Sequence, residues 1–337
     1  VAIDDIENNS GLEVETYIAT KSDIEMGINQ IYAASNEDTT EIIENLDSIG
    51  FPSRHLVYKY DYGKMNGIDF CKPKVASIVT SRGCPFRCRF CTRHITSMKS
   101  YRKRSVENII TELEEINDKY KSAMIVDDNF LAEPKSVHKI MDEIISRGIK
   151  LDLFVLSAKV DTAEKNLYKK MKKAGVKYIQ YGLESGNQDV LDYYRKNITL
   201  DQIRNAVKIA SKTNFITVGS FIFGAPFETK EHIENTMRFA RSIPLDAALF
   251  FRLAYQKGSD LWNDAVKERK IYEDEGYVIM AESQRGLGNF TDEQLSAFCT
   301  EAFKKFYIRP RFILKEVYKS ALRRDFNLLR IGLKFLK

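Results

Sequence analysis

The sequence lacks any run of about 18 consecutive apolar residues, so no segment is expected to cross a membrane as a helix. Its first residues are acidic rather than basic and apolar, so no secretory signal peptide is expected. Cysteine is scarce, with five in 337 residues. Three of the five lie close together, which does not suggest a disulfide framework and favours a reducing, cytoplasmic setting. The rest of the composition, 44% hydrophobic and 29% charged, is typical of a globular protein.

The two ends of the chain differ sharply in charge. Residues 1–50 carry twelve acidic side chains and one basic one, whereas residues 301–337 carry eleven basic and three acidic ones. The net charge of +5 conceals this asymmetry. The ends could bind different partners or each other, but solvated faces are the simpler expectation. No nucleic-acid partner is expected.

Short apolar segments alternate with helical patterns from Val75 onward. Strands are expected at 75–80, 123–127, 151–157, 177–183, 216–223 and 247–254. Between them lie amphipathic helices, two of them with N-caps at Ser105 and Thr199 and another opened by Pro134. Strands alternating with helices of this length predict an α/β fold with a parallel sheet.

Three cysteines, Cys84, Cys88 and Cys91, lie in a C-x3-C-x2-C pattern directly after the first expected strand. Gly83 and Pro85 indicate a loop there, and such a loop can direct three thiolates to one centre. Soft thiolates grouped in this way select zinc or an iron–sulfur cluster. Four arginines in and around the motif offer charge and N–H donors to an anionic cluster: Arg82, Arg87, Arg89 and Arg93.

Two interpretations of the cysteine motif stand side by side. His94 could complete a Cys3His site, which is a usual composition for structural zinc. A [4Fe–4S] cluster normally takes four cysteines, so with three of them one iron would stay open to a substrate. The cluster is the expected interpretation, because the motifs that follow fit it far better.

With aromatic Phe90 before its third cysteine, the motif resembles the cluster loop of the radical S-adenosylmethionine (radical SAM) superfamily. The resemblance implies that the open iron is chelated by the amino and carboxylate groups of SAM. Electron transfer from the cluster would then cleave SAM to methionine and a 5′-deoxyadenosyl radical. It also implies a partial (βα)6 TIM-type barrel and an electron donor such as a flavodoxin or ferredoxin.

Other expected strand ends carry residues that the same resemblance assigns to SAM. The segment after the second strand would accept hydrogen bonds from the SAM amino group, although a helix-capping turn is the alternative. The end of the fourth strand would bind the ribose, unless it is an exposed turn, and the fifth would lie along the adenine. The implied cofactor-binding residues are Phe90, Asp128, Asn129, Glu184, Ser185, Gly219 and Gly224.

Two departures from the family pattern put the substrate side of the site in question. Phe227 stands where the family usually has glycine. Residues 255–259 replace a Pro-x-Pro-Gly-Thr loop after the sixth strand. Cys71 and Cys299 are too few for an ordinary second cluster, and both are expected to be buried small residues.

Three segments resemble the cobalamin-type branch of the superfamily, and in particular its anaerobic magnesium-protoporphyrin IX monomethyl ester cyclase-like group. They are the linker at 46–56, the Arg-x-Arg at 102–104 and the Phe-Tyr-x-Arg-Pro at 306–310. A complete cobalamin-binding domain is not evident, because only about 74 residues precede the first strand, about half of what such a domain needs. Cobalamin, or a partner chain that binds it, is compatible with the sequence but not supported by it.

The expected organisation is an acidic N-terminal extension and linker over 1–74, a radical SAM partial barrel over 75–260 and a basic helical segment over 261–337. Two hypotheses for function follow. The first is a radical SAM enzyme that acts on a small molecule in a cyclase- or methyltransferase-like reaction. The second is a truncated or partner-dependent iron–sulfur protein without turnover of its own.

The basic C-terminal segment itself has two interpretations. A basic amphipathic helix can lie on an anionic membrane surface. Alternatively, its apolar face packs on the barrel and covers an edge of the sheet, while its charges stay in water. The packed arrangement is expected, because a partial barrel leaves a sheet edge that must be covered.

Overall fold

The computed structural model of the chain describes residues 42–60, 63–65, 68–93, 97 and 100–335. Residues Glu44–Lys337 form one compact unit. The proposed boundaries at residues 74 and 260 stay predictions. Much of the acidic N-terminal extension lies outside the described residues.

A six-stranded parallel sheet forms the centre of this unit, in the order β10-β9-β8-β7-β6-β3. The expected α/β fold with a partial barrel is confirmed, and the described strands do not close into a full barrel because β3 and β10 are its two edges. Each strand lies within three residues of its expected position. The strands are β3 (Val75–Ile78), β6 (Ser122–Ile125), β7 (Asp152–Ala158), β8 (Val176–Glu184), β9 (Ile216–Phe223) and β10 (Ala247–Arg252).

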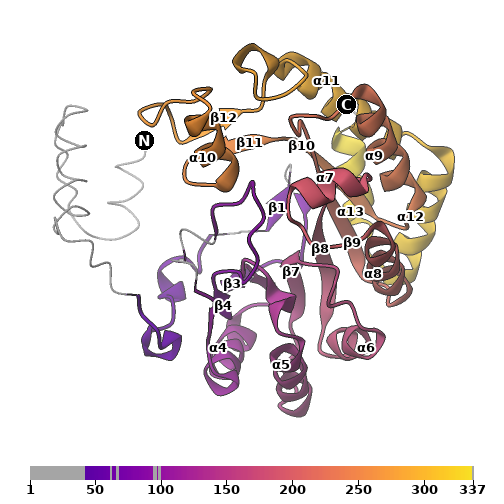
Figure 1. Ribbon diagram of the computed structural model, residues 1–337. Helices are drawn as coiled ribbons and strands as arrows, with labels where there is room; N and C mark the ends of the chain where they lie inside the picture. The colour runs from indigo at the N-terminus through magenta and orange to yellow at the C-terminus, as the bar shows by residue number, and fades with distance from the viewer. Residues whose placement is uncertain (1–41, 61–62, 66–67, 94–96, 98–99, 336–337) are drawn as a thin grey trace, which may run out of the picture. The chain divides into compact units, whose positions relative to one another are not determined.

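Helices follow the strands in turn and lie outside the sheet (Figure 1). Their starts obey the local signals in the sequence: Ser105 and Thr199 accept N-cap hydrogen bonds from the backbone three residues on, and Pro134 is the first residue of its helix. These helices are α4 (Val106–Lys119), α5 (Pro134–Ser146), α6 (Lys165–Lys173), α7 (Gln188–Tyr193), α8 (Leu200–Lys212) and α9 (Lys230–Ser242).

Smaller elements surround the barrel. The short strands are β1 (Lys64–Met65), β2 (Ile68–Asp69), β4 (Ser81–Arg82), β5 (Arg102–Lys103), β11 (Ala254–Gln256) and β12 (Val278–Met280). The 3-10 turns are η1 (Leu46–Ser48), η2 (Arg54–Leu56), η3 (Phe130–Ala132) and η4 (Ser283–Arg285). The C-terminal part contains helices α10 (Asp260–Lys267), α11 (Asp292–Tyr307), α12 (Pro310–Arg323) and α13 (Asn327–Phe335).

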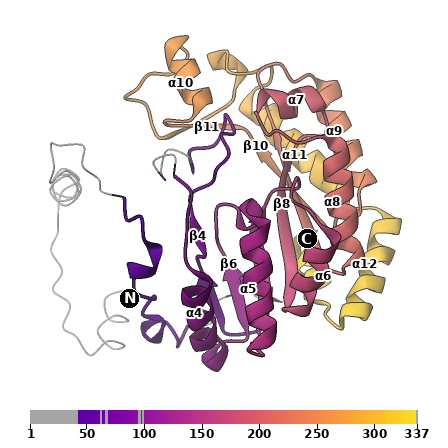
Figure 2. The ribbon, with the colours of Figure 1, turned by 60° about the horizontal axis from the view of Figure 1, so that its bottom comes forward.

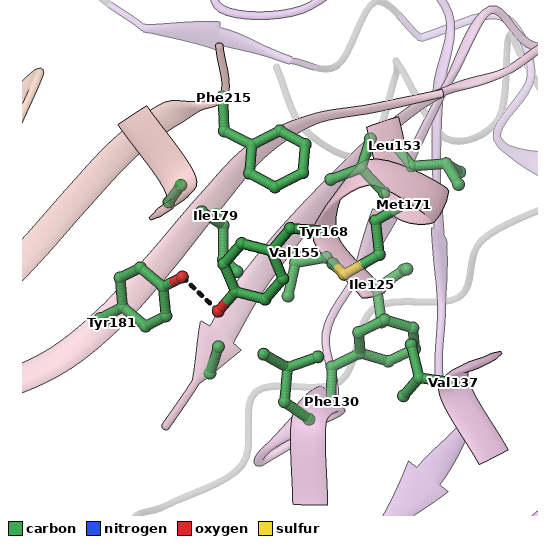
Figure 3. Close-up of a cluster of buried hydrophobic side chains, with 14 of the residues drawn as sticks. Ile125, Phe130, Val137, Leu153, Val155, Tyr168, Met171, Ile179, Tyr181 and Phe215 are labelled. Carbon is green, nitrogen blue, oxygen red and sulfur yellow. Dashed lines mark hydrogen bonds between the residues drawn. The ribbon is translucent and has the colours of Figure 1, made fainter. Parts of the chain in front are cut away.

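The main core lies between the sheet and the outer helices (Figure 3). Met171 of α6 and Phe215 pack there around the fully buried Tyr168. Burial of a phenol requires a hydrogen-bond partner, and the hydroxyls of Tyr168 and Tyr181 supply it to each other at 2.6 Å. Helix α6 is thereby fixed to strand β8, whose end carries site residues.

The linker before the barrel covers the β3 edge. Arg54 donates to the carbonyl of Ser77 at 2.6 Å, and Arg104 donates to that of Val79 at 2.9 Å. Glu112 of α4 is buried and pairs with both guanidinium groups. Arg104 of the Arg-x-Arg motif therefore holds the linker, the edge strand and α4 together.

At the other edge, α11 covers β10. The hydroxyl of Tyr307 accepts from the amide of Ala248 and donates to its carbonyl, both at 3.0 Å. One side chain thus satisfies an otherwise open position of the edge strand. The Phe-Tyr-x-Arg-Pro signature has a structural use here, since Phe306 is buried, Arg309 binds the carbonyl of Phe306 at 2.7 Å and Pro310 begins α12.

The expected orientation of the C-terminal segment is wrong for α12. Its cationic side packs inward, because Asp246 is fully buried before β10 and needs positive partners. Lys319 lies 2.6 Å and Arg323 2.8 Å from that carboxylate. Leu314, Tyr318 and Leu322 of α12 face outward instead, and the edge strand is covered by α11.

Candidate functional site

A cavity of about 400 Å³ opens at the carboxyl ends of the parallel strands. Its walls come from the cysteine loop, the ends of β7 to β10 and the segment after β6. Ligands of parallel α/β folds bind at this end of the sheet. Seven of the predicted site residues line the cavity: Cys84, Cys88, Phe90, Cys91, Asp128, Asn129 and Glu184.

The Asp127–Asp128 pair fixes the start of the cysteine loop. Asp127 is buried and accepts hydrogen bonds from the amide of Thr80 at 2.7 Å and the hydroxyl of Ser81 at 2.7 Å. Burial raises the pKa of this carboxyl, and these donors oppose the rise. Asp128 accepts from the amide of Gly83 at 3.1 Å. Both carboxylates therefore tie β6 to the loop.

The three cysteines all line the cavity. Burial raises the pKa of each thiol, that of Cys88 to about 11, while Lys196 acts against the rise. The amide of Arg93 donates to the Cys91 sulfur at 3.4 Å. Metal binding requires thiolates, and bound iron would provide the positive charge that stabilises them. Three cysteines that line one cavity of about 400 Å³ fit a cluster with one iron open.

The described residues do not test the zinc interpretation. Among the residues that the structure describes, no three His, Cys, Asp or Glu side chains are grouped as they would be around one metal ion. His94, the proposed fourth zinc ligand, lies outside those residues. A [4Fe–4S] cluster does not require the three thiolates to surround one metal ion, because each thiolate binds a different iron.

Glu184 enters the cavity through an irregularity in β8. The register between β8 and β9 shifts between Gly182 and Glu184, and Glu184 has a φ of 63°. This left-handed backbone is uncommon for a residue other than glycine. The carboxylate accepts from Lys196 at 2.6 Å, and both side chains are nearly buried. Although burial disfavours the charged amine, Glu184 and Cys88 raise the pKa of Lys196.

The other predicted residues, Ser185, Gly219 and Gly224, do not line the cavity. Ser185 is buried against α9, where its hydroxyl lies 3.2 Å from that of Thr236. A side chain at Gly219 would meet Leu183, and one at Gly224 would meet Leu295. The residues of β9 that do line the cavity are Ser220 and Ile222. Any contact of the two glycines with a ligand would therefore go through their backbone.

Two cations of the cavity, the buried Lys159 and the nearly buried Lys196, were not foreseen from the sequence. Lys196 follows α7 in a loop, so no strand end pointed to it. Lys159 follows β7 directly and lies 3.7 Å from the centre of the Phe86 ring, paired with Asp161 at 2.7 Å. A polar residue just after a buried strand was the available signal for Lys159, whereas Glu184 was predicted from the family resemblance.

The arginines of the motif do not all face the cluster position, contrary to expectation. Arg93 lines the cavity and lies 3.3 Å from Asp128. Arg89 instead pairs with Asp264 of α10 at 2.7 Å and stacks on the ring of Tyr193. Arg89 thus anchors the loop to its surroundings, and Phe90 contributes by packing edge-on against Tyr194.

The segment after β9 is held by a buried carboxylate. Glu228 accepts from the amides of Gly224 at 2.6 Å and Ala225 at 2.8 Å through one oxygen. Its second oxygen has no partner within the described residues. Burial raises the pKa of Glu228 to about 7, against the effect of the two amides.

Comparison with known protein families identifies the class. Residues 78–240 match the family model of the radical SAM superfamily. This stretch, which contains the cysteine loop and β6 to β9, is a radical SAM domain. The family implies a [4Fe–4S] cluster and SAM as cofactors. No helix among the described residues is long and apolar enough to cross a membrane.

Two curated proteins are similar to this chain over most of its length. The chain is 32% identical to an uncharacterised methyltransferase of Pyrococcus horikoshii over 84% of this chain and 61% of the relative. It is 27% identical to the anaerobic magnesium-protoporphyrin IX monomethyl ester cyclase of Rubrivivax gelatinosus over 86% of this chain and 55% of the relative. The chain therefore spans somewhat more than half the length of these relatives.

Solved structures share the fold. One is TsrM, a radical SAM methyltransferase from Kitasatospora setae with cobalamin and a [4Fe–4S] cluster bound. It matches with a TM-score of 0.55 and 16% identity over 58% of this chain and 37% of that chain. The cobalamin-dependent SAM radical enzyme OxsB, with aqua-cobalamin and SAM bound, matches with a TM-score of 0.55 and 15% identity over 75% of this chain and 46% of that chain.

Proposed function

We propose that this chain is a radical SAM enzyme that binds one [4Fe–4S] cluster through Cys84, Cys88 and Cys91 and acts on a small-molecule substrate. When bound, the cluster supplies the electron for reductive cleavage of SAM to methionine and a 5′-deoxyadenosyl radical. The observation that carries the proposal is that the three thiols and the Glu184–Lys196 pair line one cavity.

The residues of the cavity support distinct contacts with SAM. Glu184 offers a carboxylate to hydroxyl or ammonium groups, and Lys196 offers an ammonium group to a carboxylate. Phe86 and Ile222 give apolar surface to the same cavity. Charges of both signs beside apolar side chains suit a zwitterionic ligand that carries a purine.

A cyclase- or methyltransferase-like reaction is the proposed outcome, supported by the names of the relatives. The reductant would be a flavodoxin or ferredoxin, and a cobalamin-binding partner chain is part of the same proposal. The proposed location is the cytoplasm, and assays require anaerobic conditions because exposed clusters react with oxygen.

The test is cluster loading of cysteine variants. Anaerobic reconstitution should give about four irons per chain. Replacement of Cys84, Cys88 or Cys91 by alanine should abolish loading, whereas Cys71→Ala and Cys299→Ala, the matched controls, should load normally. A stoichiometric zinc ion in protein purified without oxygen would contradict the assignment.

A second candidate function is an iron–sulfur protein that needs a partner for turnover. It is favoured by one observation, namely that the chain covers 61% and 55% of the two relatives described above. The two candidates differ in one measurement. A reduced, cluster-loaded enzyme should by itself cleave SAM and release 5′-deoxyadenosine. A partner-dependent protein should bind SAM but form no 5′-deoxyadenosine.

A further inference from the structure

Helix α12 presents an apolar face to solvent. Leu314 is 69% exposed, Tyr318 65% and Leu322 58%, at successive spacings of four residues. Ile313 and Val317 lie beside them and are also exposed. Side chains at these spacings share one side of a helix. Apolar surface grouped in this way is costly in water and marks an interaction site.

Polar contacts on its inner side fix the orientation of α12. Lys319 and Arg323 on the opposite side bind the buried Asp246, and Arg323 also donates to the carbonyl of Phe215 at 2.7 Å. Rotating the helix to bury its apolar side would leave Asp246 in the interior without a cation, which is strongly unfavourable. The apolar face is therefore held outward.

Helix α12 is also an outermost element of the described structure (Figure 2). Lys315 donates to the carbonyl of Leu245 at 2.6 Å, just before β10, and Arg323 binds Phe215, just before β9. These contacts place α12 at the amino ends of the strands. The SAM cavity opens at the carboxyl ends, so a partner on α12 would leave its mouth free.

Uncompensated positive charge adjoins this face. A hollow of about 460 Å³ between α6 and α8 is lined by five lysines: Lys165, Lys169, Lys172, Lys208 and Lys212. None of them is ion-paired with a residue that the structure describes. The hollow and α12 are neighbours, because Lys319 donates to Ser211 of α8 at 3.0 Å. Burial first, and then Lys177 and Arg323, lower the pKa of Lys172 to about 8.

Arg311 and Arg324 add exposed guanidinium groups at the two ends of α12, and neither is ion-paired within the described part of the chain. A second copy of the chain would bring two cationic borders together, which disfavours self-association through this face. An apolar strip beside cations matches the boundary between acyl chains and anionic headgroups.

We propose that α12 and the α6–α8 lysine hollow dock the protein on an anionic membrane surface. Leu314, Tyr318 and Leu322 would enter the headgroup region, and the lysines would contact phosphate groups. The contact is interfacial, with α12 lying along the surface. It does not depend on the proposed catalytic function, since no residue of the cavity takes part.

The experiment is co-sedimentation of the full chain with vesicles. Wild-type protein should bind mixed phosphatidylglycerol–phosphatidylcholine vesicles and not pure phosphatidylcholine vesicles. The triple variant Leu314→Ser/Tyr318→Ser/Leu322→Ser should lose this binding at least about tenfold, because burial of apolar area drives insertion. Tyr272→Ser/Tyr277→Ser, which removes two exposed aromatic side chains elsewhere, is the control and should bind as wild type.

A second variant tests the charge separately. Lys165→Gln/Lys169→Gln should weaken binding by roughly fivefold per lysine, as each cation near an anionic surface contributes about 1 kcal/mol. Three results would overturn the proposal: no binding of wild type to anionic vesicles, unchanged binding of the triple variant, or a wild-type dimer that the triple variant converts to a monomer. The last would assign the face to a second copy.

Discussion

Glu184 and Lys196 place a carboxylate and an ammonium group 2.6 Å apart on the wall of a cavity that also holds three thiols. Buried ion pairs of this kind contribute little net stability, since desolvation of both charges offsets their attraction. Their position beside the thiols is better explained by a role in binding a zwitterionic ligand.

Glu184→Gln tests this at a single residue. The amide keeps the shape of the carboxylate but loses its charge, so SAM affinity should fall by roughly 10- to 150-fold, which corresponds to about 1.5–3 kcal/mol for a charge-assisted hydrogen bond. Iron content should not change. Affinity is measured by the effect of SAM on the spectrum of the reduced cluster.

The control is the double variant Glu184→Gln/Lys196→Met, which removes both charges. It should recover any stability that the single variant loses by leaving Lys196 unpaired, yet it should still bind SAM weakly. Unchanged SAM affinity in Glu184→Gln would place the ligand elsewhere.

Glu228 gives a prediction about pH. Its pKa is raised from 4.5 to about 7 by burial, so between these values the folded state binds more protons than the unfolded state. The free energy of unfolding should therefore decrease as pH rises from about 4.5 to about 7. Each pKa unit corresponds to about 1.4 kcal/mol, so the effect is a few kcal/mol at most.

The measurement compares denaturant unfolding of wild type and Glu228→Gln across this pH range. The amide can still accept from Gly224 and Ala225, and it has no charge to lose, so the difference in stability between the two proteins should shift in favour of the variant as pH rises. A difference that is independent of pH would show that Glu228 keeps an ordinary pKa.

At the scale of elements, α12 is held by charge on its inner side. Burial alone would raise the pKa of Asp246, but Arg323, Lys319 and Lys315 hold it below its ordinary value. Asp246→Asn should cost about 3–5 kcal/mol, because three cations lose their shared buried anion. Chemical denaturation checks this. Asp325→Asn, at an exposed carboxylate just after the same helix, is the control and should change stability little.

The barrel elements could be predicted from the sequence, since apolar strands, N-caps and proline starts are local signals. The face of α12 that packs on the barrel could not be predicted in this way, because an amphipathic pattern has the same period whether its apolar or its charged face is buried. The packed face depends on the ion pair with Asp246, which lies 73 residues away from Lys319 in the sequence. The local spacing pattern identified the cysteines, and the family resemblance identified Glu184. Lys196 was missed because it reaches the cavity from a loop that carries no recognisable pattern.

Alternation within strands limited the rest of the site prediction. The end of β9 was identified as part of the site, yet Gly219 faces the outer core, whereas Ser220 and Ile222 of the same strand line the cavity. A shift of one residue reverses the face of a strand. The resemblance of a motif therefore predicts which segment belongs to the site. It does not predict which side chains of that segment point into the cavity.

At the scale of the whole molecule, the C-terminal helices are part of the folded unit. Phe312 of α12 packs on the buried Phe306 with ring centres 5.0 Å apart, Ile331 of α13 is buried, and α13 contacts β2. Deletion after Arg309 would remove all of these contacts and leave Asp246 buried without its cations. We therefore expect global destabilisation, with a lower melting temperature and greater binding of a dye that recognises exposed apolar surface.

The triple variant Leu314→Ser/Tyr318→Ser/Leu322→Ser is the matched control for this deletion, because it changes the outer face of α12 and keeps every inner contact. It should melt close to wild type, while the deletion should not. If the truncated chain instead stays folded and loads its cluster normally, the Asp246 network does not support the barrel, and the stability of the radical SAM domain must reside in the strands and in helices α4 to α11 alone.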